Sequence, residues 1–275
     1  MQYPLPHHLI SRLTGRLTRV RQTAFKDWMI RSFIRRFGVD MSEAAESDPA
    51  AYPTFNAFFT RALRAGARPV DAAKNSIVSP VDGAVSQAGV IHSDRIFQAK
   101  GQIFSALELL GGSVDDARLF DDGSFATLYL SPRDYHRIHM PVAGNLRRML
   151  HVPGRLFSVN PPTTRAVPRL FARNERVVSL FDTDVGPLAL VMVGAMNVAS
   201  IETVWAGIVT PPPRASIRSW DYKSGEVRLA QGAEAGRFNM GSTVILLFAA
   251  GRLRWEASCV PDAQVRMGRR LATRL

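Results

Sequence analysis

The sequence predicts an α+β protein: an antiparallel, β-rich domain of sandwich-like or barrel-like form, with amphipathic helices collected at the N-terminus. From Ile77 onward, short apolar runs are separated by turn residues, which is typical of strands. Residues 7–38 instead carry apolar side chains at intervals of three and four, as one face of a helix does. With 275 residues, 46% of them hydrophobic, the chain is long enough to bury a core as one domain with an appendage.

The N-terminal 40 residues are basic as well as amphipathic. Eight Lys or Arg against two Asp give this segment a net charge of +6, half of the +12 carried by the whole chain. With Trp28 and several phenylalanines on the apolar side, such helices suit a membrane interface. They equally suit packing on the domain with the basic face in water, and the sequence alone does not choose between these interpretations.

No uninterrupted apolar run predicts a transmembrane helix, since the longest candidate, residues 188–209, is broken by Asn197, Ser200 and Glu202. The N-terminus also lacks the compact apolar stretch of a cleaved secretory signal. A single cysteine, Cys259, excludes an intramolecular disulfide and favours a buried structural thiol over a nucleophile. The net positive charge indicates an anionic partner, which could be nucleic acid, anionic lipid or an acidic substrate.

Between the basic segment and the strands, residues 41–72 predict short helices and turns. Phe55, Phe58 and Phe59 lie within five residues of one another, and we expect them in the core. One helix is expected inside the strand-rich part, at about 104–111. The expected strands are short segments bounded by turn residues: 76–81, 84–91, 95–99, 124–131, 144–152, 176–183, 187–195, 198–209, 226–232, 244–249 and 252–258.

A Gly-Ser-Thr step at residues 241–243 leads directly into an apolar run, which places a serine hydroxyl at the mouth of a buried strand. Alone, this pattern indicates no more than a turn before a strand. A hydroxyl nucleophile needs a base within hydrogen-bond reach, often oriented by a carboxylate, and His139 and Asp82 are the upstream candidates. Asp82 lies in a Pro-Val-Asp-Gly sequence that also suits an ordinary turn. The G-x-S-x-G elbow of the α/β-hydrolases is absent.

Two histidines, His136 and His139, lie three residues apart in the sequence. They could form a metal pair on a helix, but there is no HExxH pattern and no evident third ligand, so we expect no metal. On a strand, side chains three residues apart point to opposite faces, which argues against a shared site. A turn between Tyr135 and Pro141 would remove that objection, and Pro132 and Pro141 make such a turn plausible.

Taken together, the motifs resemble those of the phosphatidylserine decarboxylase family over roughly residues 54–248. The matching segments are Pro80-Val81-Asp82-Gly83, Tyr135-His136-Arg137-Ile138-His139-Met140-Pro141 and Gly241-Ser242-Thr243, with Gln98-Ala99-Lys100-Gly101, Ser131-Pro132-Arg133-Asp134, Asn174-Glu175-Arg176 and Gly194-Ala195 between them. The basic amphipathic start is also typical of the membrane-bound members. One departure is Met240, where the family usually has Leu; the two side chains are close in volume, so we expect little effect.

The resemblance implies that the chain cuts itself between Gly241 and Ser242. The Ser242 hydroxyl would attack the Gly241 carbonyl, with His139 and Asp82 as the matching base and carboxylate. The ester so formed would be eliminated to dehydroalanine and hydrolysed to a pyruvoyl group. The products would be a β chain, residues 1–241, and an α chain of 34 residues, 242–275.

The pyruvoyl group derived from Ser242 is then the implied cofactor. Its ketone would form a Schiff base with the substrate amine and accept the electrons left behind as carbon dioxide departs. His136 is the implied donor of the proton that the carbanion takes up, since histidine can serve near neutral pH. Arg133 and Arg137 flank the histidine motif, where they could meet the substrate phosphate or carboxylate or could be ordinary surface arginines.

The implied reaction converts phosphatidylserine to phosphatidylethanolamine at an anionic phospholipid membrane. The resemblance further implies a homodimer, bound peripherally on the cytoplasmic side of the cell membrane. Residues 1–40 would form the membrane-associating helices and residues 41–275 the catalytic domain. A Ser-His-Asp lipid hydrolase is the alternative enzyme, and its chain would stay intact at 30.3 kDa. A membrane- or nucleic-acid-binding module is a third class, although no RRM, KH or zinc-finger pattern indicates nucleic acid.

Overall fold

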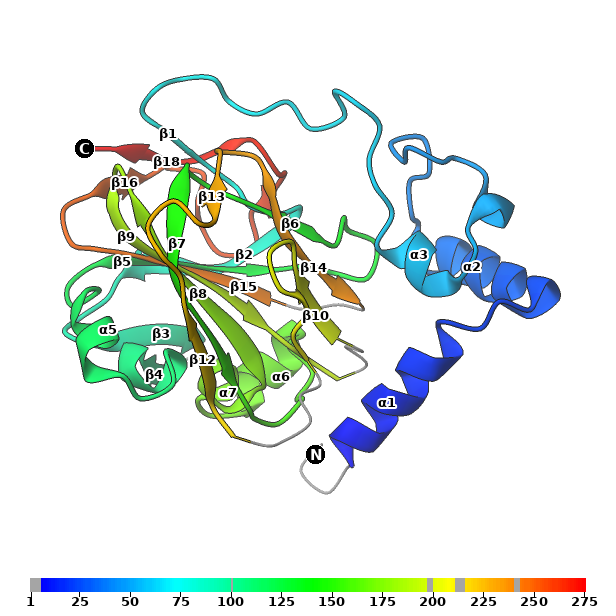
Figure 1. Cartoon of the computed structure of the whole chain (residues 1–275), viewed down its shortest axis with the longest axis horizontal. Helices are drawn as coiled ribbons and strands as arrows, with labels where there is room; N and C mark the ends of the chain where they lie inside the picture. The colour runs from blue at the N-terminus through cyan, green and yellow to red at the C-terminus, as the bar shows by residue number, and fades with distance from the viewer. Residues whose placement is uncertain (1–5, 100, 197–199, 211–215, 240–242) are drawn as a thin grey trace.

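The computed structural model describes residues 6–99, 101–196, 200–210, 216–239 and 243–275. It confirms the α+β class, because antiparallel sheets form the body and small helices gather at the N-terminus (Figure 1). The sheets are open, and none that these described residues form closes into a barrel. The helices are α1 His7–Leu17, α2 Thr23–Phe37, the 3-10 turn η1 Pro49–Ala51, α3 Phe55–Phe59, α4 Ala106–Leu109, α5 Val114–Arg118, α6 Pro161–Ala166 and α7 Leu170–Arg173.

The strands belong to four sheets, of which the largest has nine strands. They are β1 Ser76–Val78, β2 Gly83–Val90, β3 Arg95–Ala99, β4 Gln102–Ser105, β5 Ser124–Tyr129, β6 Arg137–His139, β7 Gly144–Val152, β8 Arg176–Thr183, β9 Gly186–Val193, β10 Ser200–Thr203, β11 Gly207–Ile208, β12 Arg218–Asp221, β13 Arg228–Leu229, β14 Glu234–Asn239, β15 Thr243–Phe248, β16 Leu253–Trp255, β17 Gln264–Val265 and β18 Arg270–Arg274.

The nine-stranded sheet carries the main core. Its order is β12-β7-β8-β9-β15-β5-β2-β17, with β13 also paired to β7. Strand β15 lies between β9 and β5, and every residue from Thr243 to Phe248 is buried. A strand buried on both faces needs an unbroken apolar run, which is why the segment after the Gly-Ser-Thr step lacks the usual alternation.

A second, four-stranded sheet with the order β11-β10-β14-β6 carries the histidine motif. In Figure 1 it lies beside the N-terminal helices. Strand β14 pairs with β10 on one side and β6 on the other, so its last residue, Asn239, lies opposite Ser200. A turn over this motif was one sequence interpretation; the structure has strand β6 there instead, with the turn residues at Pro132 and Arg133.

The N-terminal helices pack together around aromatic side chains. Phe33 of α2 contacts the rings of Phe55, Phe58 and Phe59, at centroid distances of 5.1 to 6.1 Å. These rings and Ile30 form a separate apolar cluster, which confirms that the three phenylalanines of α3 are core residues. Helix α2 ends at Gly38, a single residue in the left-handed conformation with φ 65°. The segment 7–38 is therefore helical as predicted and forms two helices, α1 and α2.

Some of the expected strands have the bounds that the structure shows. The expected segments 144–152 and 176–183 coincide with β7 and β8. The expected helix at 104–111 is the short α4, which a capping box at Ser105 and Glu108 begins. The expected strand 198–209 is split into β10 and β11, and its first two residues lie outside the described part of the chain. Strands β4, β6, β12, β14, β17 and β18 had no counterpart among the predicted segments.

Candidate active site

The Pro-Val-Asp-Gly motif forms the connection between β1 and β2. Ser79 stabilises this connection, because its hydroxyl donates to the Val81 carbonyl at 2.7 Å. Gly83 then begins β2 with φ 154°, and a Cβ atom there would lie only 2.2 Å from the Tyr129 carbonyl oxygen. Only glycine permits this close approach of β2 to β5. The motif thus places Asp82 at the edge where β2 enters the main sheet.

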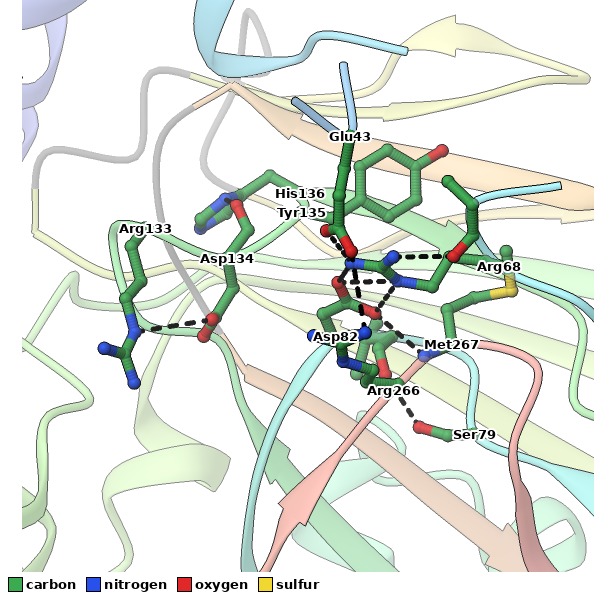
Figure 2. Close-up of polar contacts among 12 residues, drawn as sticks. Glu43, Arg68, Ser79, Asp82, Arg133, Asp134, Tyr135, His136, Arg266 and Met267 are labelled. Carbon is green, nitrogen blue, oxygen red and sulfur yellow. Dashed lines mark hydrogen bonds and ion pairs between the residues drawn. The ribbon is translucent and has the colours of Figure 1, made fainter. Parts of the chain in front are cut away.

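The carboxylate of Asp82 is held by Arg68, a residue that sequence reasoning did not single out. Arg68 Nε lies 2.9 and 3.0 Å from the two Asp82 oxygens, and Nη2 lies 2.5 Å from Oδ2 (Figure 2). The Met267 N–H donates to Oδ1 at 2.9 Å. Arg68 Nη2 also reaches Glu43 at 2.6 Å. One guanidinium therefore binds two carboxylates. The Arg68 and Asp82 side chains are 7% and 10% exposed.

This cluster shifts the ionisation of its members. The hydrogen bond to Asp82 is the largest cause that raises the pKa of Arg68 above its ordinary value. The hydrogen bond from Arg68 likewise holds the pKa of Glu43 below its usual range. Both residues therefore stay charged across the physiological pH range.

His139 lies at the end of β6 with both ring nitrogens engaged. Nδ1 is 2.8 Å from the Gly232 carbonyl oxygen, and Nε2 is 3.1 Å from the Tyr135 hydroxyl. A carbonyl oxygen only accepts, so Nδ1 carries the proton and Nε2 accepts from the tyrosine. Burial lowers the pKa of His139 and raises that of Tyr135 to about 12, so both groups are neutral at pH 7. His139 therefore presents a basic Nε2 lone pair.

His136 precedes β6 and is completely buried. Its Nδ1 donates to the Asp134 carbonyl at 2.8 Å, and its ring lies 4.1 Å from the Phe59 ring of α3. Nε2 is buried and has no partner among the described residues. Burial lowers the pKa of His136 to about 3, so the ring is neutral and the unpaired nitrogen is a lone pair.

The structure brings Asp82 and His139 onto neighbouring segments without joining their side chains. The His139 backbone N–H donates to the Pro80 carbonyl at 2.9 Å, two residues from Asp82. Among the described residues, however, the Asp82 carboxylate accepts hydrogen bonds only from Arg68 and Met267. The group that orients the His139 ring here is the Gly232 carbonyl, which the sequence could not indicate because it lies 93 residues away.

Gly241 and Ser242 lie outside the described residues, but both flanks of this step are buried. Thr243 begins β15 opposite Tyr129 and Val193, and its hydroxyl has no partner among the described residues. On the other side, Asn239 donates to the Ser200 hydroxyl at 2.6 Å and accepts from Asn56 of α3 at 2.9 Å. The segment between β14 and β15 is therefore anchored at both ends.

Cys259 is buried, as the sequence led us to expect. Desolvation raises the pKa of its thiol to about 11. At neutral pH the thiol is therefore protonated and is a poor nucleophile. The chemistry of the described site thus rests on carboxylates, histidines, tyrosine and arginine.

Comparison with known proteins agrees with this set of motifs. The profile of the phosphatidylserine decarboxylase family matches residues 55–273, and a second profile, described as PSD, matches residues 1–38. The chain is 59% identical over 270 residues to the phosphatidylserine decarboxylase proenzyme of Azotobacter vinelandii, covering 97% of this chain and 94% of the relative.

Two further relatives carry the same name. The protein of Bordetella petrii is 58% identical, over 98% of this chain and 95% of its own. That of Shewanella sediminis is 55% identical, over 99% of this chain and 96% of its own. With the fold and motifs described above, these matches show that the chain belongs to the phosphatidylserine decarboxylase family.

Proposed function

We propose that this chain decarboxylates phosphatidylserine to phosphatidylethanolamine with a pyruvoyl group that it makes from Ser242 by self-cleavage after Gly241. The relatives are named phosphatidylserine decarboxylase proenzymes, which supports an enzyme made from a longer precursor. The observation that carries the proposal is His139, a buried neutral histidine whose Nε2 lone pair accepts from the Tyr135 hydroxyl and from no backbone group. Such a group is suited to take a proton from a nearby hydroxyl.

Self-cleavage would begin when His139 Nε2 accepts the Ser242 hydroxyl proton and the oxygen attacks the Gly241 carbonyl. The peptide C–N bond breaks as the ester C–O bond forms, and the proton returns to the serine nitrogen. Loss of the Ser242 α-proton then breaks the ester, leaving a Gly241 carboxylate and a dehydroalanine. One water molecule converts this residue to the pyruvoyl group and releases ammonia. The chain supplies the base and the anchored segment that keeps the reacting atoms together.

In this proposal Asp82 acts on His139 through its charge. No hydrogen bond joins the two side chains, yet the Asp82 charge is among the influences that raise the pKa of His139. A negative charge nearby stabilises the imidazolium that forms when His139 takes the proton. Arg68 and the Met267 N–H keep that charge in place.

The described surroundings fit a pyruvoyl group after Gly241. Two buried polar atoms near the step lack partners among the described residues, His136 Nε2 and Thr243 Oγ1, and both can hydrogen-bond to carbonyl or amine groups. The pyruvoyl group supplies a ketone that condenses with an amine and withdraws electrons as carbon dioxide leaves. His136, neutral at rest, would have to take up a proton before it could donate one to the product.

Intact mass spectrometry tests self-cleavage directly. We expect the wild-type chain to give a large fragment ending at Gly241 and a fragment of 34 residues, because the latter starts at Ser242. Borohydride should add two hydrogens to the small fragment by reducing its ketone. Ser242→Ala should stay at full length and lose decarboxylase activity. An intact, borohydride-insensitive wild-type chain with lipase activity would instead favour the Ser-His-Asp hydrolase, which the comparisons do not support.

The membrane part of the proposal rests on the N-terminal helices. Leu9, Leu13 and Leu17 of α1 and Trp28 of α2 are 49 to 62% exposed. An apolar groove of about 470 Å³ runs between α1, α2 and α3, with Trp28, Phe33 and Phe37 in its wall. No helix in the described part of the chain has the length and apolar character needed to cross a bilayer. Apolar side chains beside a net charge of +6 suit peripheral binding to an anionic membrane.

We therefore propose a peripheral location on the cytoplasmic side of the cell membrane, with residues 1–40 as the membrane-associating part. The boundary at residue 40 crosses an apolar cluster, because Ile30 and Phe33 of α2 pack on α3. Removing residues 1–40 would expose the α3 cluster that includes Phe59, whose ring contacts His136. Substitution of exposed side chains is therefore a cleaner test than truncation. The homodimer implied by the family resemblance stays a prediction.

Replacing both Leu13 and Trp28 with Ser should weaken binding to phosphatidylglycerol-containing vesicles at least tenfold. Each exposed apolar side chain that enters the interface contributes about 1.5 kcal/mol or more. Self-cleavage should continue, since neither side chain reaches the site. Val114→Ser on α5, also 50% exposed, is the matched control. Unchanged vesicle flotation of the double variant would contradict the proposed anchoring.

A further inference from the structure

A polar pocket of about 330 Å³ opens beside the Asp82 cluster. It joins the loop after α2 to the histidine motif and to the segment around β17. Figure 2 shows Asp82, Arg133, Asp134 and Tyr135 around this region. Its charged lining includes Glu43, Arg61, Arg68, Asp82, Arg133 and Asp134.

Most charged groups in this pocket already have ionic or hydrogen-bonding partners. Arg68 binds both Asp82 and Glu43, and Arg266 lies 3.5 Å from Glu43. Asp40 accepts from Ser42 at the rim. The Asp134 carboxylate accepts from the backbone N–H and hydroxyl of Ser131, and burial raises its pKa. Arg61 and Arg133 are the two cations of the lining without a close ion pair, since the contact of Arg133 with Asp134 is 4.0 Å long.

Arg61 is a buried cation without a counterion. The residue is 5% exposed, and no carboxylate of the described residues lies within ion-pair distance of it. Its Nη2 donates to the Arg133 carbonyl at 3.2 Å, its guanidinium lies over the Phe58 ring, and its Nε has no partner. Burial lowers the pKa of Arg61, and the more distant charges of Asp82, Asp134 and Glu43 oppose this effect only in part. A buried charge of this kind is unfavourable until an anion joins it.

Arg133 adds a second cation at the mouth of the same pocket. Its side chain is 60% exposed, and its contact with Asp134, at 4.0 Å, is at the limit of an ion pair. A buried guanidinium and an exposed one, both facing a pocket, form a binding site for a group with several anionic oxygens. Phosphate groups have this character.

We propose that this pocket binds the phosphodiester of the phospholipid head group through Arg61 and Arg133. This inference rests on the proposed function and adds to it the residues that recognise the substrate. The position is suitable: Thr243, next to Ser242, is paired with Tyr129, and Tyr129 with Ala84, two residues after Asp82. The pocket residue Asp82 and the cleavage step therefore lie at the same end of the main sheet.

The phosphodiester fits these arginines better than the substrate carboxylate does. The carboxylate loses its charge as carbon dioxide leaves, so a fixed guanidinium on it would stabilise the ground state more than the transition state. The phosphodiester keeps its charge throughout the reaction. Cations that hold it lower KM without opposing decarboxylation.

The test separates self-cleavage, which needs no substrate, from turnover of phosphatidylserine in detergent micelles. Arg133→Gln and Arg61→Gln should both self-cleave fully, and KM should rise about tenfold with kcat changed less than twofold. Arg254→Gln, an exposed arginine of β16 outside the pocket, is the control and should behave as wild type. If Arg61→Gln does not fold, Arg133→Gln still tests the proposal. The Arg133 side chain is largely in solvent, so its substitution should leave the fold intact.

Water-soluble competitors identify the group that is bound. Glycerophosphoethanolamine, which has the phosphodiester but no carboxylate, should inhibit Arg133→Gln about tenfold more weakly than wild type. Inhibition by free serine should be the same in both. Weakened inhibition by serine instead, or an unchanged KM in both variants, would overturn the proposal. Inorganic phosphate that inhibits as well as glycerophosphoethanolamine would assign the pocket to free phosphate and also overturn it. A wild-type chain that does not cleave would refute the proposed function itself.

Discussion

Replacing His139 with Gln is expected to slow self-cleavage by a factor of about 10² to 10⁴, the range that a positioned general base contributes. The Gln amide can still meet the Gly232 carbonyl but offers no basic nitrogen. The measurement is the fraction of intact chain against time after cell-free synthesis, read by denaturing electrophoresis. His92→Gln removes an exposed histidine and is the control. Cleavage of His139→Gln at the wild-type rate would remove His139 from the mechanism.

The pH dependence of wild-type self-cleavage provides a second check on the same residue. Burial lowers the pKa of His139 below 6.5, and only the neutral form accepts a proton. The rate should therefore remain on its plateau as pH falls through 6.5 and decline only below the lowered pKa. A midpoint above 6.5 would contradict a buried neutral base.

The free energy of unfolding should also decrease as pH falls below about 6.5. A histidine whose pKa is lower in the folded state stabilises the fold above its unfolded value of about 6.5. That contribution is lost as pH falls, because the unfolded chain binds the proton first. For His136 the loss should extend from pH 6.5 down to about 3, its folded pKa.

Replacing Arg68 with Gln is expected to lower the free energy of unfolding by about 3 kcal/mol, the lower end for a broken buried ion pair because a pocket opens beside it. Asp82 and Glu43 would then lie close together without the cation that binds both. Displacement of Asp82 should also slow self-cleavage. The stability measurement is urea unfolding in a Ser242→Ala background, which keeps every variant in one covalent form.

Two further variants in that background separate charge from geometry. Arg68→Lys keeps the charge but cannot reproduce the contact of Nε and Nη2 with one carboxylate, so an intermediate loss is expected. Glu43→Gln leaves the Arg68–Asp82 pair intact and should change stability by less than about 1 kcal/mol. If Arg68→Gln had wild-type stability and cleaved at the wild-type rate, the contact of Arg68 with Asp82 would have no role in folding or self-cleavage.

Local sequence patterns predicted much of the fold. Strand β8 matches its predicted range because Val177, Val178, Leu180 and Phe181 form a nearly continuous apolar run, which indicates burial without further context. Strand β14 was missed because its sequence, Glu-Ala-Gly-Arg-Phe-Asn, has neither an apolar run nor a clear alternation. It is a strand because β10 and β6 hydrogen-bond to it on both sides. Strand β18, with arginine at both ends, was missed for the same reason.

The sequence by itself determined the family, the fold class and the positions of the chemical motifs. Each of these depends on residues close together in the chain: an apolar run after Gly-Ser-Thr, two histidines three apart, and Asp82 in its turn. Only the tertiary structure decided what these side chains meet. Arg68 holds Asp82, the Gly232 carbonyl sets the proton on His139, and Arg61 is buried without a counterion. Hydrogen bonds and burial arise from contacts between segments that are distant in the sequence. They determine the pKa values of these side chains, so both can be established only from the folded structure.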